Sequence, residues 1–218
     1  MLLFYMEESP LSIMAAKIFL FNFDEFSEFI GAIPYTEEDD FVASQVFISD
    51  KEQLLKYRQA IKNNLQATIE EVHKVIADGS AMEAIASFKY DKMAKEPLSG
   101  EPENLIEVVN QSQTYLISLM AVEYLMKKHP GTVFTVNWGN IPGYDIESED
   151  QSIIAECFAA TSYRSNQKLV KDLKRLMDNQ TASYKYEFFY DKEFEESHRA
   201  YYEDSFPGIK IVKFTGME

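Results

Sequence analysis

Hydrophobic residues recur at helical spacing in three stretches of the chain. In residues 51–77 they form a narrow stripe, with Asp50 as the expected N-cap and Gly79 as the expected stop. This stripe suits packing on a core or pairing with a second subunit, and core packing is favoured. Residues 104–128 are apolar around most of the helix circumference, which is typical of a buried helix. A third helix is predicted over residues 165–177.

Short runs rich in β-branched and aromatic residues predict strands between and after these helices. They are 132–137 (TVFTVN), 144–147, 152–160 (SIIAECFAA), 184–190 (YKYEFFY) and 209–214 (IKIVKF). A turn over 148–151 predicts a hairpin between the second and third runs. A polar helix is expected over 191–202. The pattern therefore predicts an α/β (α+β) fold with a mixed sheet flanked by helices.

The segment 96–103 (EPLSGEPE) has two prolines and a glycine in eight residues and predicts a boundary. We expect residues 1–100 to be a mostly helical N-terminal elaboration and residues 101–218 to be the core. No internal repeat is present.

Composition narrows the class of protein. The 218 residues are 46% hydrophobic and carry a formal charge of −15, which argues against disorder and against general binding to nucleic acid or anionic membranes. One cysteine, Cys157, and three histidines exclude a disulfide and the usual zinc motifs. The start of the chain lacks a basic n-region and no apolar run is long enough to cross a membrane, so a soluble cytoplasmic protein is expected.

The negative charge is concentrated near the N-terminus. Residues 1–50 hold ten acidic side chains and one base, Lys17, and residues 22–40 interleave phenylalanines with carboxylates. A solvated amphipathic element is the favoured interpretation of this segment. The alternative is a surface that binds a basic site on a protein partner.

Two acids in the predicted hairpin are the main candidates for chemistry. A turn over 148–151 pairs Asp145 with Ile154 and places Glu156 one diagonal step away on the same face. Two carboxylates at this spacing could share a hard divalent cation. Taken alone, Asp145 also fits a structural turn residue, and Glu156 fits an ion pair with the next helix.

The predicted helix after Glu156 is basic in an otherwise acidic protein. Arg164, Lys168, Lys171, Lys174 and Arg175 lie there with one acid, Asp172. Such a face could bind the phosphates of a nucleic acid. A solvated helix face is the simpler alternative.

The order helix, three strands, helix, strand over residues 104–190, with Asp145 and Glu156 on the second and third strands, resembles the PD-(D/E)xK nuclease superfamily. The resemblance implies a restriction-endonuclease-like fold and an acidic pair that binds Mg²⁺. It implies an endonuclease that hydrolyses phosphodiester bonds, with DNA as the expected substrate. Asp145, Glu156 and Lys168 would be catalytic, and Asp145 and Glu156 would hold the metal. A third ligand would come from the helix over residues 104–128, where Glu107 is favoured over Gln111 and Glu123. Lys171, Arg164 and Arg175 would bind phosphate.

The sequence departs from the family pattern in two places. Pro142 lies three residues before Asp145, and Phe158 stands where the family has its lysine, two residues after Glu156. Lys168, or failing it Lys171, would then replace the family lysine from the following helix. The alternative is a catalytically silent nuclease fold that serves as a binding or regulatory protein. A homodimer is compatible with either function.

Overall fold

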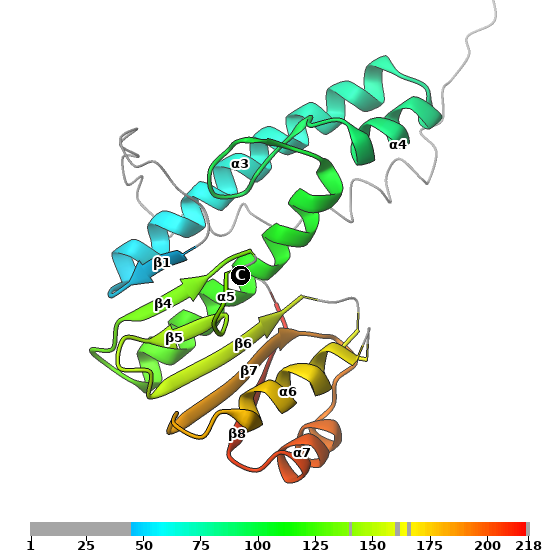
Figure 1. Ribbon diagram of the computed structural model, residues 1–218. Helices are drawn as coiled ribbons and strands as arrows, with labels where there is room; N and C mark the ends of the chain where they lie inside the picture. Colours follow the sequence, from blue (N-terminus) through cyan, green and yellow to red (C-terminus); the bar gives the residue numbers. More distant parts are fainter. Residues whose placement is uncertain (1–44, 140, 160–161, 165–166, 217–218) are drawn as a thin grey trace, which may run out of the picture. The chain divides into compact units, whose positions relative to one another are not determined.

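The described residues include a six-stranded mixed sheet (Figure 1). The computed structural model describes residues 45–139, 141–159, 162–164 and 167–216. The strand order is β1-β4-β5-β6-β7-β8, antiparallel from β1 to β6 and parallel from β6 to β8. The strands are β1 Gln45–Ile48, β4 Phe134–Asn137, β5 Ile146–Ser148, β6 Ile153–Phe158, β7 Tyr184–Tyr190 and β8 Ile209–Phe214.

Five helices accompany the sheet within the described residues. They are α3 Lys51–Asp78, α4 Ala81–Tyr90, α5 Leu105–Lys128, α6 Lys168–Asp178 and α7 Glu196–Ser205. The Asp50 side chain accepts a hydrogen bond from Gln53 N at 2.9 Å, as expected of an N-cap, and Asn104 caps α5 in the same way. None of these helices combines the length and the apolar character that crossing a membrane requires.

The predicted mixed sheet is confirmed, and the flanking helices lie close to their predicted limits. Helix α6 joins β6 to β7, which are parallel, so it is the predicted crossover. Strand β1 was not predicted, and the polar helix α7 begins five residues later than expected. The acidic segment 22–40 lies outside the described residues.

Two apolar clusters cover opposite faces of the sheet. The larger cluster holds Ile117 and Leu125 of α5 with Ala155, Cys157 and Phe188 of the sheet. The second cluster holds Leu169, Leu173 and Leu176 of α6 with Ile154, Phe158, Phe189 and Ile211. Because alternate residues of a strand face opposite sides, Glu156 and Glu187 lie on the face that α6 covers.

The segment predicted as a boundary is an ordered hairpin. Strands β2 Ala94–Lys95 and β3 Pro102–Glu103 pair antiparallel, and Glu96 Oε2 accepts hydrogen bonds from Leu98 N at 2.8 Å and Ser99 N at 2.6 Å. The Leu98 side chain is buried in the larger cluster. The described residues belong to one compact unit, and the predicted boundary falls inside it.

The β5–β6 hairpin is shifted by one residue from its predicted turn. Glu147, and not Asp145, pairs with Ile154, and the loop covers residues 149–152. Ser148 remains in β5 because its buried hydroxyl accepts from Ile153 N at 2.9 Å and donates to Asp150 Oδ1 at 2.6 Å. The shift moves the cross-strand partner of each residue by two positions, and residues two apart on a strand lie on the same face. The prediction that Asp145 and Glu156 share a face is therefore unaffected.

Candidate functional site

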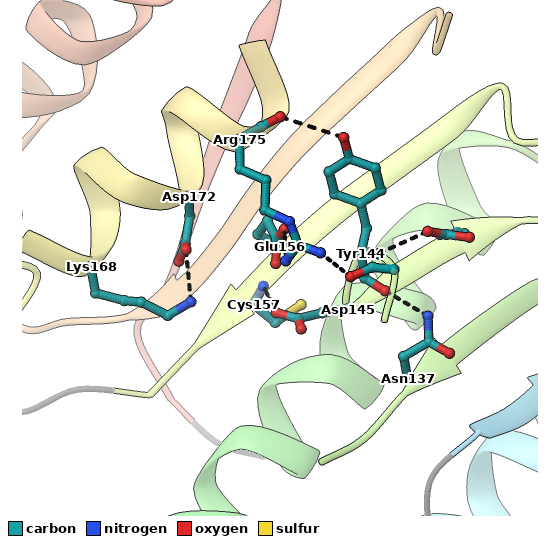
Figure 2. A network of polar contacts seen from close by, with 10 residues as sticks. Asn137, Tyr144, Asp145, Glu156, Cys157, Lys168, Asp172 and Arg175 are labelled. Carbon is teal, nitrogen blue, oxygen red and sulfur yellow. Dashed lines mark hydrogen bonds and ion pairs between the residues drawn. The ribbon is translucent and has the colours of Figure 1, made fainter. Parts of the chain in front are cut away.

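Asp145 and Glu156 lie at the same end of the β5–β6 pair (Figure 2). Extending the observed pairing by one residue places Asp145 opposite Glu156. Asp145 O accepts from Asn137 N at 2.9 Å, and its Oδ2 accepts from Cys157 N at 2.7 Å. The side chain of Asp145 is therefore fixed against the backbone of β6, next to the carboxyl group of Glu156.

Glu156 is a fully buried carboxyl group in the middle of an apolar strand. Its Oε1 lies 2.6 Å from Arg175 Nη1, but neither carboxylate oxygen has a hydrogen-bond partner of good geometry. Burial, followed by the neighbouring charge of Asp145, raises the pKa of Glu156 to about 9, although Arg175 opposes the shift. Arg175 therefore offsets only part of the cost of ionising this buried carboxyl group.

Arg175 connects α6 to the loop before β5. Its Nη2 donates to the carbonyl of Gly143, and its guanidinium lies 4.9 Å from the centre of the Tyr144 ring. Tyr144 N in turn donates to Glu147 Oε1 at 2.8 Å. With the Glu156 ion pair, one half-exposed arginine thus holds the loop, the strand and the helix together.

Lys168 and Asp172 form a second ion pair on α6. Their Nζ and Oδ1 atoms are 2.7 Å apart, one turn along the helix. Burial lowers the pKa of Lys168, but the hydrogen bond and charge of Asp172, with the charges of Asp145 and Glu156, raise it overall. Burial raises the pKa of Asp172, and Lys168 offsets part of that rise. Lys168 is thus charged and near both candidate acids.

The predicted direct contact of Lys168 with Asp145 or Glu156 is not formed. Among the described residues, its ammonium pairs only with Asp172. Contact through a bridging water stays a prediction.

Glu187 of β7 is a further acid of this site. It pairs in register with Glu156 across the parallel strands, it is fully buried, and both of its carboxylate oxygens lack a hydrogen-bond partner. Burial raises its pKa well above the ordinary value, and the charges of Asp172 and Glu156 add to the rise. Two adjacent β strands therefore each place a carboxyl group under α6.

The other predicted site residues are more exposed. Lys171 is exposed on α6, and Arg164 is exposed and donates from Nε to Tyr163 OH at 2.8 Å. Glu107 is exposed in the first turn of α5, beside the separate apolar cluster of Leu105 and Val108. Nothing brings the Glu107 side chain into contact with Asp145 or Glu156 in the described part of the chain. Phe158 is buried and stacked on Phe189, with ring centroids 4.9 Å apart.

The chain matches no protein-family model and no curated protein.

Sequence reasoning missed Glu187 and gave no role to Asp172. Glu187 had the same signal as Glu156, since it is the single acid in an aromatic strand, YKYEFFY. An unpaired charge in such a run is costly unless something compensates it. Asp172 was visible as the acid four residues after Lys168 on a basic helix.

The charges of the cluster do not balance. Four carboxyl groups, those of Asp145, Glu156, Asp172 and Glu187, face the cations Lys168 and Arg175. If all six groups ionise, two negative charges remain uncompensated in a region of low dielectric. The described residues contain no three His, Cys, Asp or Glu side chains already arranged around a metal position. Cation binding would therefore require side chains to rearrange.

Proposed function

We propose that the protein is a Mg²⁺-dependent nuclease that hydrolyses phosphodiester bonds, with DNA as the substrate. The observation that carries the proposal is the position of Glu156: a fully buried carboxyl group next to Asp145, under a helix that supplies Lys168 and Arg175. A buried acid of this kind is costly to the fold, and such costs are typical of functional sites.

Asp145 and Glu156 fit a hard cation in their chemistry. Carboxylate oxygens are the ligands that Mg²⁺ prefers, and the two oxygens of Glu156 lack hydrogen-bond partners. When bound, Mg²⁺ would lower the pKa of a coordinated water and offset the charge that develops on the phosphate. Asp145 is held in place for this role by the backbone N–H of Cys157.

The basic side chains of α6 would act on the phosphodiester. Lys168, kept protonated by its acidic neighbours, would stabilise the negative charge of the transition state. Arg175 could exchange Glu156 for a phosphate oxygen, because its guanidinium is half-exposed. Lys171 and Arg164 lie exposed, where phosphates of the flanking nucleic acid could reach them.

A catalytically silent binding or regulatory protein is the second candidate. Phe158, at the lysine position of the nuclease pattern, is packed between the sheet and α6 and cannot reach a phosphate. Arg175 already compensates part of the Glu156 charge without any ligand. Both features would be expected in a fold that has lost catalysis.

Cleavage of plasmid DNA with and without Mg²⁺ tests the proposal. Lys168→Ala should reduce Mg²⁺-dependent cleavage about a hundredfold, because the lysine stabilises transition-state charge. Lys174 is an exposed lysine of the same helix, so Lys174→Ala is the matched control. It should change the cleavage rate less than about twofold. Asp145→Asn should abolish cleavage while its amide oxygen still accepts from Cys157 N.

Cleavage by Asp145→Asn at the wild-type rate would contradict the assignment of the active site to Asp145 and Glu156. A folded wild-type protein without any Mg²⁺-dependent cleavage of DNA would favour the silent fold.

A further inference from the structure

Glu187 is the acid that the fold explains least. It lies in the central strand of the parallel part of the sheet, 0% exposed, with Glu156 as its direct partner on β6 and Ile211 on β8. Asp145 has the N–H of Cys157, and Asp172 has Lys168 at 2.7 Å. Neither oxygen of Glu187 has a hydrogen-bond partner.

A structural role does not account for this carboxyl group. Its neighbours on the same face, Phe189 and Ile211, belong to the apolar cluster under α6. An apolar side chain of similar volume would fill the position without the cost of burying an unpartnered polar group. No neighbouring side chain among the described residues supplies a hydrogen-bond partner for this acid.

The direction of Glu187 indicates what that partner is. Residues paired across parallel strands present their side chains on the same face, so Glu187 and Glu156 both lie under α6. Asp172, Glu156 and Asp145 are the acidic charges that act on Glu187, and Lys168 is the opposing cation. A hard divalent cation would supply the two positive charges that this cluster lacks.

We propose that Glu187 is a third carboxylate ligand of the divalent cation site, together with Asp145 and Glu156. The inference rests on the proposed Mg²⁺-dependent function and replaces Glu107 as the third ligand. Glu156 would come from β6, Glu187 from β7 and Asp145 from the loop before β5. The remaining coordination positions of the cation would be left for water and a phosphate oxygen.

Arg175 is the group that the cation would displace. Its guanidinium now lies 2.6 Å from Glu156 Oε1, and its side chain is 47% exposed, so it can swing toward solvent. The described residues show no three-ligand arrangement, so cation binding requires these side chains to move. Release of Arg175 would free Glu156 to turn toward the cation shared with Glu187.

Titration calorimetry of the full chain with Mn²⁺ and with Mg²⁺ tests the proposal. Glu187→Gln keeps the shape of the side chain and removes its charge, and should weaken cation affinity at least tenfold. Glu123→Gln is the control, because Glu123 is a partly buried carboxylate whose cations are Arg58 and Lys127. It should bind Mn²⁺ as the wild type does.

Thermal unfolding in EDTA and in Mg²⁺ gives a second measurement. Mg²⁺ should raise the melting temperature of the wild type, because the cation binds only the folded state. Glu187→Met should melt at a higher temperature than the wild type in EDTA and lose the response to Mg²⁺. This combined result distinguishes a ligand from a structural residue, whose replacement would lower the melting temperature under both conditions.

The outcomes separate this inference from the proposed function. Cation binding in the wild type that is unchanged in Glu187→Gln would overturn the role of Glu187 and leave the nuclease proposal standing. A wild type that binds neither cation would overturn both. Failure of both Glu187 variants to fold would overturn the inference, since the carboxyl group would then be needed for stability.

Discussion

The buried position of Glu156 disfavours the ionised form of its carboxyl group. It is buried in β6, has Asp145 and Glu187 as acidic neighbours, and has one half-exposed arginine as its counter-charge. Its pKa is raised to about 9, so burial favours the protonated form at neutral pH, while Arg175 favours the ionised form. Burial also raises the pKa of Glu187. Binding a divalent cation should therefore release protons from this pair.

The raised pKa of Glu156 predicts that stability falls with rising pH. Above its ordinary pKa of about 4.5 the group ionises in the unfolded chain, while the folded protein keeps the proton until about pH 9. Stability should be greatest below the ordinary pKa and decrease toward pH 9, by at most about 1.4 kcal/mol per pH unit for this one group. Urea unfolding between pH 5 and 9, without divalent cations, measures the slope.

Glu156→Gln should flatten this pH dependence, because an amide does not titrate. Glu187 and Asp172 also have raised pKa values, so part of the slope should remain. An unchanged slope in Glu156→Gln would contradict the assignment of the shift to this residue.

The sequence contained a signal for both buried acids, Glu156 and Glu187, but only Glu156 was predicted to have a role. Glu156 was predictable as an acid inside an apolar run, and Glu187 has the same signal in an aromatic run. Its role was missed because a strand was a sufficient explanation for the tyrosines and phenylalanines around it. The Arg175 contacts with Gly143 and Tyr144 could not be predicted, because they depend on how a loop meets a helix far away in sequence.

Among the elements, the β5–β6 hairpin fixes the distance between the two predicted acids. Its four-residue loop is organised by Asp150, whose Oδ1 accepts from Ser152 N at 3.0 Å and from the hydroxyl of Ser148 at 2.6 Å. These hydrogen bonds lower the pKa of Asp150 to about 2. Gln151 follows with a φ of 57°, in the left-handed region that side chains disfavour.

Gln151→Gly should therefore stabilise the protein. Glycine adopts a positive φ without steric cost, and the relief of strain should exceed the added freedom of the unfolded chain by up to about 1 kcal/mol. Gln151→Val, with a β-branched side chain, should destabilise by about 1–2 kcal/mol. Chemical denaturation of both variants measures the difference.

Glu149→Gly is the control in the same loop. Glu149 does not have a positive φ, so glycine should give no gain there. A stabilisation equal to that of Gln151→Gly would contradict the strain argument.

The long helices were predictable, and so were the short strands β4 and β5, which lie within the predicted runs 132–137 and 144–147, apart from the last residue of β5. The 28-residue α3 and the 24-residue α5 have both a sustained apolar pattern and a capping residue, and both begin where the pattern predicts. Strand β1, four residues of sequence QVFI, was not predicted, because no β-branched run or flanking turn marks it as TVFTVN marks β4. The hairpin register was wrong because it depends on the Ser148 hydroxyl, which keeps that residue in the strand.

In the molecule as a whole, helix α3, which precedes the predicted boundary, belongs to the same core as the sheet. Leu54 and Ile61 of α3 and Leu98 of the β2–β3 hairpin lie in the cluster that packs against the sheet. Trp138 is in the same cluster, with its ring centroid 4.9 Å from that of Tyr115 and 5.7 Å from that of Tyr57. The composition of residues 96–103 indicated a linker, but one buried leucine joins this segment to the core.

Leu98→Ala should destabilise the whole unit by about 2–4 kcal/mol, because the leucine is fully buried in the main cluster. Trp138 fluorescence and far-UV circular dichroism should lose signal in one coincident transition. Ile85→Ala, at an exposed position on α4, should change stability by less than about 0.5 kcal/mol. Two separate transitions would instead support independent units on either side of residue 100.

The thiol of Cys157 lies on the face of the sheet opposite the candidate site and can be used to monitor opening of β6. Its N–H holds Asp145, while its thiol is buried in the main cluster and has a pKa that burial raises. It is the only cysteine of the chain, so a thiol-specific reagent reports on a single position. The rate of thiol labelling then measures how often β6 opens. That rate gives a kinetic readout of the site that needs neither substrate nor an engineered cysteine.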